Sequence, residues 1–172
     1  MLNRLFHIAV NSKDLERSVA FYRRLGFQVL QEREVHNEKV KEAFAVPTGD
    51  LHFVHLRLGD SEEATMLDIV EWGGPGTADG TGPPPQHQQG ITRFAVLTDD
   101  TDRVHRELSA EGVEFLTSPT LVMTPEGGWK VCLALDPDGV VVQVTELVPA
   151  AGAAREAAHA AAQDTPTTGW GA

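Results

Sequence analysis

One stretch of the sequence occurs twice. Residues 6–30 read FHIAVNSKDLERSVAFYRRLGFQVL, and residues 92–116 read TRFAVLTDDTDRVHRELSAEGVEFL. A gapless alignment places Asp14 on Asp100 and Gly26 on Gly112. A duplicated supersecondary unit constrains the architecture more strongly than any single motif, because each copy must bury its apolar face in the same way. The chain is therefore predicted to contain two modules of one fold.

Each copy has the pattern of a strand, a helix and a second strand. In residues 7–10, apolar and more polar side chains alternate with the period of two that is typical of a strand with one buried face. Asp14 and Asp100 stand where a helix needs an N-cap, and Gly26 and Gly112 stand where a helix end needs a positive φ. The apolar residues between these caps recur at helical spacing, so we expect each helix to pack on a sheet.

Two further strands are expected after each copy. They are predicted at residues 51–58 and 66–72, and at 129–135 and 140–147, where the tight-turn sequence Asp136-Pro137-Asp138-Gly139 joins the second pair. Each module is thus predicted to be β-α-β-β-β, in an α+β chain. The expected boundaries are a first module at 1–73, a Gly- and Pro-rich linker at 74–90, a second module at 91–148 and an alanine-rich tail at 149–172.

The alternation of the strands separates a face toward the helix from a face away from it. The polar or reactive side chains expected on the face away from the helix are His7, His55, Arg57, Asp68, Arg93, Cys132 and Gln143. These residues are the candidates for a binding or catalytic site. Glu71 and Glu146, at matching strand ends, are expected to be surface carboxylates.

Composition excludes several classes of function. A formal net charge of −11 argues against a nucleic-acid surface. No stretch approaches the ~20 apolar residues that a membrane span requires, and the first residues do not show the pattern of a secretory leader. The single Cys132 allows no intrachain disulfide, which is typical of a cytoplasmic protein.

Two tandem β-α-β-β-β modules, with His7 in the first strand, glycine at the end of both helices and Asp-Pro-Asp-Gly before the last strand, resemble the vicinal oxygen chelate superfamily. The resemblance covers about residues 3–147. This superfamily includes glyoxalase I, extradiol dioxygenases and bleomycin-binding proteins. The resemblance implies that the modules form a curled mixed sheet around a central cavity, which often holds a divalent metal. One fold serves many chemistries, so the resemblance alone does not determine the activity.

The resemblance also implies four ligand positions, in the first and last strand of each module. Here they are His7, Asp68, Arg93 and Gln143. His7, Asp68 and Gln143 can coordinate Zn, Ni, Mn, Fe or Co, whereas the guanidinium of Arg93 stays protonated and has no lone pair to donate. A bidentate pair of Arg93 with Asp68 would occupy the place of the metal. We therefore expect no catalytic metal, and a divalent metal is the alternative.

Without a metal, the same residues predict acid–base chemistry. His7 is expected to act as general base or acid, because an imidazole titrates near neutral pH. Arg93 would stabilise an enolate or phenolate oxygen, and Asp68 would orient Arg93 or His7. The residues expected to contact the substrate are His55, Arg57, Gln143 and Cys132.

Two classes of function stay open. The first is an enzyme, a lyase, isomerase or cyclase that acts on a small oxygenated metabolite; the alanine-rich composition is typical of high-GC bacteria and suggests secondary metabolism. The second is a non-catalytic binder that sequesters an antibiotic, although aromatic residues at 6% of the chain give a stacking cavity little support. A metal-dependent dioxygenase is disfavoured by Arg93. In either class we expect a homodimer.

Overall fold

The computed structural model describes residues 3–150. The chain divides into two compact units, of which one comprises the residues up to 94 together with 135–142, and the other comprises 95–134 and the residues from 143 onward. The alanine-rich tail expected from residue 149 lies outside the described residues from 151 onward. Within residues 3–150, no helix is long and apolar enough to cross a membrane.

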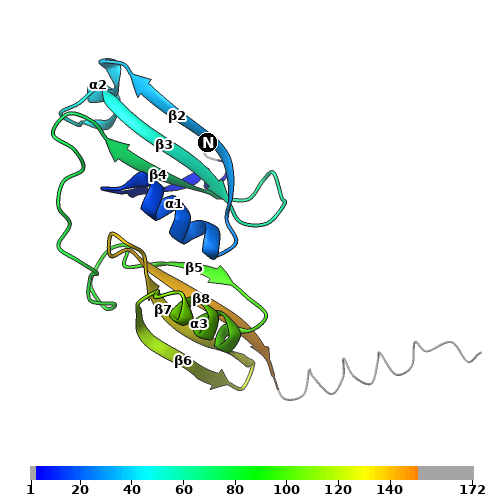
Figure 1. The fold of residues 1–172 in the computed structure, drawn as a ribbon. Helices are drawn as coiled ribbons and strands as arrows, with labels where there is room; N and C mark the ends of the chain where they lie inside the picture. The colour runs from blue at the N-terminus through cyan, green and yellow to red at the C-terminus, as the bar shows by residue number, and fades with distance from the viewer. Residues whose placement is uncertain (1–2, 151–172) are drawn as a thin grey trace, which may run out of the picture. The chain divides into compact units, whose positions relative to one another are not determined.

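The first sheet contains β1 (His7–Asn11), β2 (Gln28–His36), β3 (Asp50–Arg57) and β4 (Met66–Trp72), in the spatial order β1-β4-β3-β2. It is a mixed sheet, because β1 runs parallel to β4 while the other neighbours are antiparallel. Helix α1 (Leu15–Arg24) covers one face (Figure 1). Val54, Leu56, Leu67 and Ile69 are at most 2% exposed, which confirms the predicted alternation of β3 and β4.

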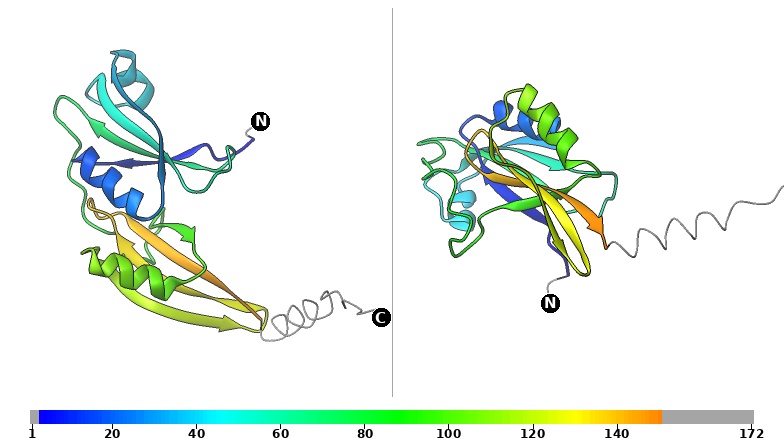
Figure 2. Two further views of the ribbon diagram at one scale, coloured as in Figure 1. Left: turned by 45° about the vertical axis from the view of Figure 1, so that its right-hand side comes forward. Right: turned by 90° about the horizontal axis from the view of Figure 1, so that it is seen from below.

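The second sheet contains β5 (Phe94–Leu97), β6 (Phe115–Thr124), β7 (Gly127–Leu135) and β8 (Val141–Pro149). Its spatial order, β5-β8-β7-β6, repeats that of the first sheet, and α3 (Thr101–Ala110) follows its first strand. Figure 2 shows that each sheet is twisted and open and does not close into a barrel. The predicted α+β architecture of two β-α-β-β-β modules is therefore confirmed.

The polar segment after Leu30 continues the second strand of the first module. β2 continues to His36, and a short helix α2 (Lys39–Phe44) follows it. β2 is the edge strand of its sheet, so its polar sequence can pair with β3 while most of its side chains stay exposed. Within the described residues, 73–93 form no helix or strand.

The predicted helix caps are confirmed in both modules. The side chain of Asp14 accepts a hydrogen bond from the Arg17 N–H at 3.0 Å, and Asp100 accepts one from the Arg103 N–H at 2.8 Å. Gly26 and Gly112, which follow the two helices, have φ values of 92° and 84°. The capping contacts and the glycine conformations fix where each helix begins and ends.

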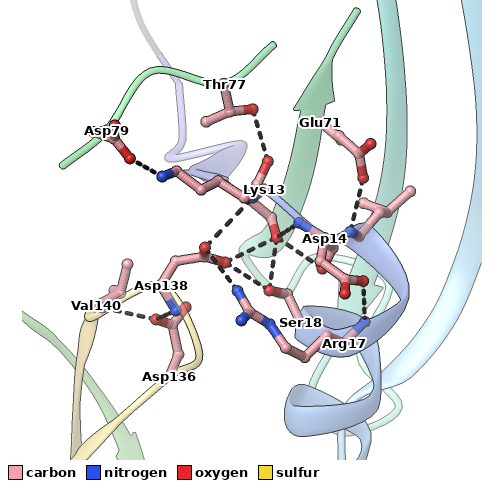
Figure 3. A network of polar contacts seen from close by, with 12 residues as sticks. Lys13, Asp14, Arg17, Ser18, Glu71, Thr77, Asp79, Asp136, Asp138 and Val140 are labelled. Carbon is pink, nitrogen blue, oxygen red and sulfur yellow. Dashed lines mark hydrogen bonds and ion pairs between the residues drawn. The ribbon is translucent and has the colours of Figure 1, made fainter.

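The Asp-Pro-Asp-Gly turn takes part in a polar network within the first unit (Figure 3). Asp138 Oδ2 lies 2.8 Å from the Ser12 hydroxyl and 2.9 Å from the Ser18 hydroxyl, and Asp138 Oδ1 accepts from Arg17 Nη2 at 3.0 Å. Both serines are fully buried. The turn therefore anchors the start of α1 through charge-assisted hydrogen bonds.

Candidate functional site

A row of polar side chains crosses the face of the first sheet that points away from α1. Gln31 of β2 pairs directly with His55 of β3, and His55 pairs directly with Asp68 of β4. Asp68 in turn lies opposite Ala9 of β1, and His7 is two residues before Ala9 on the same face. Because directly opposed residues in a sheet place their side chains next to one another, the strand register alone assembles this row.

Three members of the row converge on one point. One potential ligand atom from each of His7, His55 and Asp68 lies within 4.8 Å of the others. His55 Nε2 is 3.4 Å from Asp68 Oδ1, and both side chains are 13% exposed. The ring centroids of His7 and His55 are 6.2 Å apart. We call these three residues the His–His–Asp cluster.

Two buried polar atoms of the cluster lack a hydrogen bond of good geometry, although one of them, Asp68 Oδ1, has His55 Nε2 at 3.4 Å. Among the described residues, His7 Nδ1 and Asp68 Oδ1 are buried and make no hydrogen bond. Leaving a buried polar atom unpaired costs about 1–3 kcal/mol, so such atoms are uncommon in folded proteins unless a water, an ion or a ligand satisfies them. The cluster is therefore incomplete as it stands, and it suits a ligand that satisfies both atoms.

Burial also acts on the charge of the cluster. It raises the pKa of the Asp68 carboxyl above its ordinary value, while the neighbouring imidazoles of His55 and His7 act in the opposite direction. A carboxylate at this position is poorly hydrated. Its charge is balanced best by a cation placed between the carboxylate and the two imidazoles.

His55 is also held from its other side. Gln31 Nε2 lies 2.5 Å from His55 Nδ1. The ring of Phe53, two residues earlier on the same face, has its centroid 4.8 Å from that of His55 at an interplanar angle of 44°. With a hydrogen bond at Nδ1 and an aromatic ring alongside, His55 is fixed with Nε2 toward Asp68.

The donor set fits a divalent cation. Two imidazoles and one carboxylate are the ligands that Zn²⁺ and Fe²⁺ take in many catalytic sites, where three protein ligands leave positions for substrate. His7 Nδ1 and Asp68 Oδ1, which make no hydrogen bond, are both atoms of the type that coordinates such a cation. The residues present are therefore suited to hold it.

The sequence matches the Glyoxalase/Bleomycin resistance protein/Dioxygenase superfamily over residues 4–144. The chain belongs to this superfamily. Members of the superfamily share the duplicated module seen here and carry out several unrelated activities, so the assignment establishes the fold and leaves the reaction to the site. The comparison with curated proteins gives no match.

Solved structures of the superfamily share the fold. A glyoxalase family protein from Bacillus cereus aligns with a TM-score of 0.74 at 15% identity, over 86% of this chain and 96% of its own. The trypanothione-dependent glyoxalase I of Leishmania major aligns with a TM-score of 0.57 at 19% identity, over 95% and 97%. A glyoxalase family protein from Enterococcus faecalis gives 0.56 at 22% identity, over 83% and 97%. Identities this low show similarity of fold alone.

Two of the four ligand positions implied by the superfamily resemblance lie in the cluster, namely His7 and Asp68. The third member, His55, was expected to contact substrate and was not considered as a ligand. The sequence carried a signal for it, because His55 and Asp68 were both predicted on the face away from α1. Only the antiparallel register, which sets the two residues directly opposite each other, shows that they meet.

The predicted bidentate pair of Arg93 with Asp68 is not formed, because Asp68 Oδ1 has no hydrogen-bond partner. Arg93 Nη1 instead donates to Gln86 Oε1 and Thr92 Oγ1, both at 3.3 Å. β5 begins only at Phe94, so Arg93 precedes the strand and the predicted alternation does not fix its direction.

Gln143 and Arg57 both form hydrogen bonds within their own modules. Gln143, the fourth implied ligand position, donates through Nε2 to Thr145 Oγ1 at 2.9 Å. Arg57 donates through Nε to the carbonyl oxygen of Gly59 at 3.1 Å, in the turn after β3. Their expected roles in ligand or substrate binding stay predictions.

Cys132 lies on the opposite face from the one predicted. It is fully buried, and Lys130, which shares its face of β7, forms an ion pair with Asp102 at the start of α3. Apolar residues stand on both faces of β7, so the alternation of the sequence alone does not decide which face packs on the helix. Burial, with a smaller contribution from Asp102, raises the pKa of the Cys132 thiol to about 11.

A separate cleft of about 880 Å³ in the first unit is lined by residues 46–48 and 75–80 and by Lys13, Arg17 and Trp72 among others. Lys13 pairs with Asp79, and Arg17 pairs with Asp138, so carboxylates neutralise both cations (Figure 3). The lining includes no member of the His–His–Asp cluster. The volume of the cleft does not by itself indicate a reaction, so the His–His–Asp cluster remains the candidate active site.

Proposed function

We propose that the chain is a glyoxalase-like enzyme of the lyase or isomerase type, which acts on a small oxygenated metabolite at the His–His–Asp cluster with a divalent cation held there. The observation that carries the proposal is the convergence of ligand atoms of His7, His55 and Asp68 within 4.8 Å, with no hydrogen bond to the buried His7 Nδ1 and Asp68 Oδ1. Arg93 was the reason to expect no metal from the sequence, and Arg93 is not one of the three cluster residues.

Each member of the cluster has a defined part in this proposal. His7 and His55 hold the cation through imidazole nitrogens, and Asp68 neutralises part of its charge. When bound, such a cation acts as a Lewis acid that polarises a substrate oxygen. The three residues come from β1, β3 and β4 of one sheet, so their positions are set by backbone pairing and not by a mobile loop.

Metal content tests the proposal first. Untagged protein purified without chelator is analysed for bound metals and titrated calorimetrically with Co²⁺ and Zn²⁺. We expect about one equivalent per chain, and a large loss of affinity in His7→Ala, His55→Ala and Asp68→Ala. His52→Ala is the matched control, because His52 lies in β3 as His55 does but pairs with Glu32 outside the cluster. If Gln143→Ala lost metal affinity and His55→Ala did not, the ligands would instead be the residues at the positions that the superfamily resemblance implies.

Catalysis is tested separately from binding. A lyase or isomerase that forms an enolate exchanges the proton next to a carbonyl with solvent, so deuterium should enter 2-hydroxyketones or 2-keto acids incubated with the protein in D₂O. Proton NMR of a panel of such compounds measures this exchange. Tight binding of a compound without any exchange or turnover would favour the antibiotic-sequestering alternative.

The metal-free enzyme is the second candidate, and one observation favours it. His7 Nδ1 is buried and makes no hydrogen bond, so it is available to exchange a proton with a substrate. In this case activity survives exhaustive chelation and is lost in His7→Ala, while His55→Ala retains part of it. The cation-dependent proposal requires the activity to disappear with the metal.

The expected homodimer stays a prediction. Sedimentation should show a species of twice the chain mass of 18.6 kDa, and a single species at the chain mass would exclude it.

A further inference from the structure

The charged side chains of the first sheet are sorted between its two faces. Directly paired residues share a face, so the strand register assigns each residue of the four strands to one side. On the face toward α1, these strands carry only carboxylates besides histidines, namely Glu32, Glu34, Asp50 and Glu71. On the face away from α1, they carry one carboxylate, Asp68, and both of their arginines, Arg33 and Arg57.

This sorting gives the face of the His–His–Asp cluster a positive balance in an acidic chain. Two arginines against one aspartate leave this face with an excess of positive charge, whereas the whole chain has a formal net charge of −11. A divalent cation at the cluster would add to the excess. A surface lined by one sign of charge raises the local concentration of ligands of the opposite sign. The face therefore favours an anionic ligand.

Arg33 lies one step along the sheet from the cluster. It pairs directly with Phe53 of β3, and the next pair on the same face is Gln31 with His55. Alternate residues of a strand are about 7 Å apart, so the backbone of Arg33 is offset by about this distance from the row that contains His55. A group bound by Arg33 is therefore separate from a group bound at the cluster.

The charge of Arg33 is not offset by the carboxylates beside it in the sequence. Glu32 and Glu34 point to the other face. There Glu32 Oε1 lies 2.8 Å from His52 Nε2. Glu34 Oε2 lies 3.8 Å from His36 Nε2. Arg33 itself is exposed, so its guanidinium can contact a ligand.

The sheet surface between Arg33 and the cluster is apolar. Phe53 pairs directly with the buried Val70 of β4 and is itself half-buried. Its ring centroid lies 4.8 Å from that of His55. Binding sites commonly combine an apolar lining with a few polar groups that fix the orientation of the ligand. The ring of Phe53 thus suits the carbon skeleton of a ligand that is polar at both ends.

We propose that Arg33 is a specificity-determining residue, which binds a carboxylate or phosphate group of the substrate while another oxygen of the substrate meets the His–His–Asp cluster. This inference rests on the proposed function and names the class of substrate: a small oxygenated metabolite with an anionic group remote from the reacting carbon. A guanidinium suits this part, because its planar fork of donors binds carboxylate and phosphate groups through two parallel hydrogen bonds.

Two pairs of compounds test the class of substrate. 2-Oxoglutarate differs from 2-oxopentanoate in a terminal carboxylate, and dihydroxyacetone phosphate differs from dihydroxyacetone in a phosphate. Calorimetry measures their affinities for the full chain with and without Co²⁺. We expect the more anionic compound of at least one pair to bind about tenfold more tightly or better, and that pair distinguishes carboxylate from phosphate. No preference in either pair would overturn the inference.

Variants test whether Arg33 is the source of the preference. Arg33→Gln should reduce it about tenfold, and Arg33→Lys should retain more of it, because lysine keeps the charge and loses the fork. Arg23→Gln is the matched control, since Arg23 is an exposed arginine on α1 and its loss changes the net charge equally. Thermal unfolding checks that each variant is folded. An unchanged preference in a folded Arg33→Gln, or an equal loss in Arg23→Gln, would refute the role of Arg33.

The results separate this inference from the proposed function. If the chain binds no Co²⁺, the proposed cation site fails, and the preference measured without metal still decides the role of Arg33. If Co²⁺ binds at the cluster and neither anionic compound is preferred, the inference about Arg33 fails and the cation site stands.

Discussion

Glu71 Oε2 accepts a hydrogen bond from the backbone N–H of Leu15 at 2.8 Å. The contact joins the end of β4 to the first residue of α1. The second module repeats it, with Glu146 Oε2 and the Thr101 N–H at 3.0 Å. Each helix thus has a glutamate from the last strand of its module as a second cap beside its N-cap aspartate. Both glutamates, expected to be surface carboxylates, are half-buried and have this capping role in addition.

Removing this second cap should destabilise the first module. Glu71→Ala leaves the Leu15 N–H without its partner and should cost about 1–3 kcal/mol in the free energy of unfolding. Glu71→Gln should cost less, because its amide oxygen can still accept. Thermal and urea unfolding followed by circular dichroism measure both changes. Glu62→Ala, at an exposed turn position, is the control, and an equal loss in Glu62→Ala would argue against the capping role.

Asp138→Asn should weaken the anchor between the β7–β8 turn and α1. Asparagine offers one acceptor oxygen and no charge in place of a carboxylate that takes contacts from Ser12, Ser18 and Arg17. We expect a loss of about 2–3 kcal/mol at neutral pH, measured by urea unfolding. Asp60→Asn, at an exposed position, should leave stability unchanged.

The same substitution should change the acid dependence of stability. Burial acts to raise the pKa of Asp138, but the hydrogen bonds from Ser12, Ser18 and the Lys13 N–H, with the charge of Arg17, lower it below its ordinary value overall. A lowered pKa in the folded state contributes stability above the unfolded pKa of about 4, and this stability is lost as the pH falls through the lowered value. The difference in melting temperature between wild type and Asp138→Asn should therefore be constant near neutral pH and shrink below about pH 4. A difference that grows in acid would contradict this sign.

Cys132 should be unreactive in the folded chain. At pH 8 a thiol with a pKa of about 11 is thiolate in only about one molecule in a thousand, and Cys132 is also fully buried. We expect Ellman's reagent to react slowly with the native protein and rapidly after urea unfolding. Cys132→Ser gives the baseline, since the chain contains 1 cysteine. Fast native labelling would place the thiol at an accessible surface.

Metal should stabilise the chain through the cluster. A ligand at about 100 times its dissociation constant adds about 2.7 kcal/mol to the free energy of unfolding if it binds only the folded state. Co²⁺ should thus raise the melting temperature of the wild type and of His52→Ala, and EDTA should reverse the shift. His55→Ala should show no shift at the same concentration. A shift of equal size in His55→Ala would place the metal elsewhere.

Local interactions explain why much of the fold was predictable. The repeat, the Asp14 and Asp100 caps and the glycines at positive φ depend on residues close together in the sequence, and the structure has all of them. The faces of β3 and β4 were also predicted correctly, because a strand buried on one side must alternate. The face of β7 was predicted wrongly, because apolar residues stand on both of its faces and the alternation alone is ambiguous.

The sequence by itself determined the two modules, their element order and a set of polar residues on the sheet faces away from the helices. The tertiary structure decided which of these residues meet. His55 joins Asp68 and Gln31 because antiparallel strands set them opposite each other across three strands, and Glu71 reaches Leu15 because β4 ends beside α1. Such contacts depend on strand register, because a shift of one residue moves every side chain of a strand to the other face of the sheet. No local pattern in the chain encodes this register.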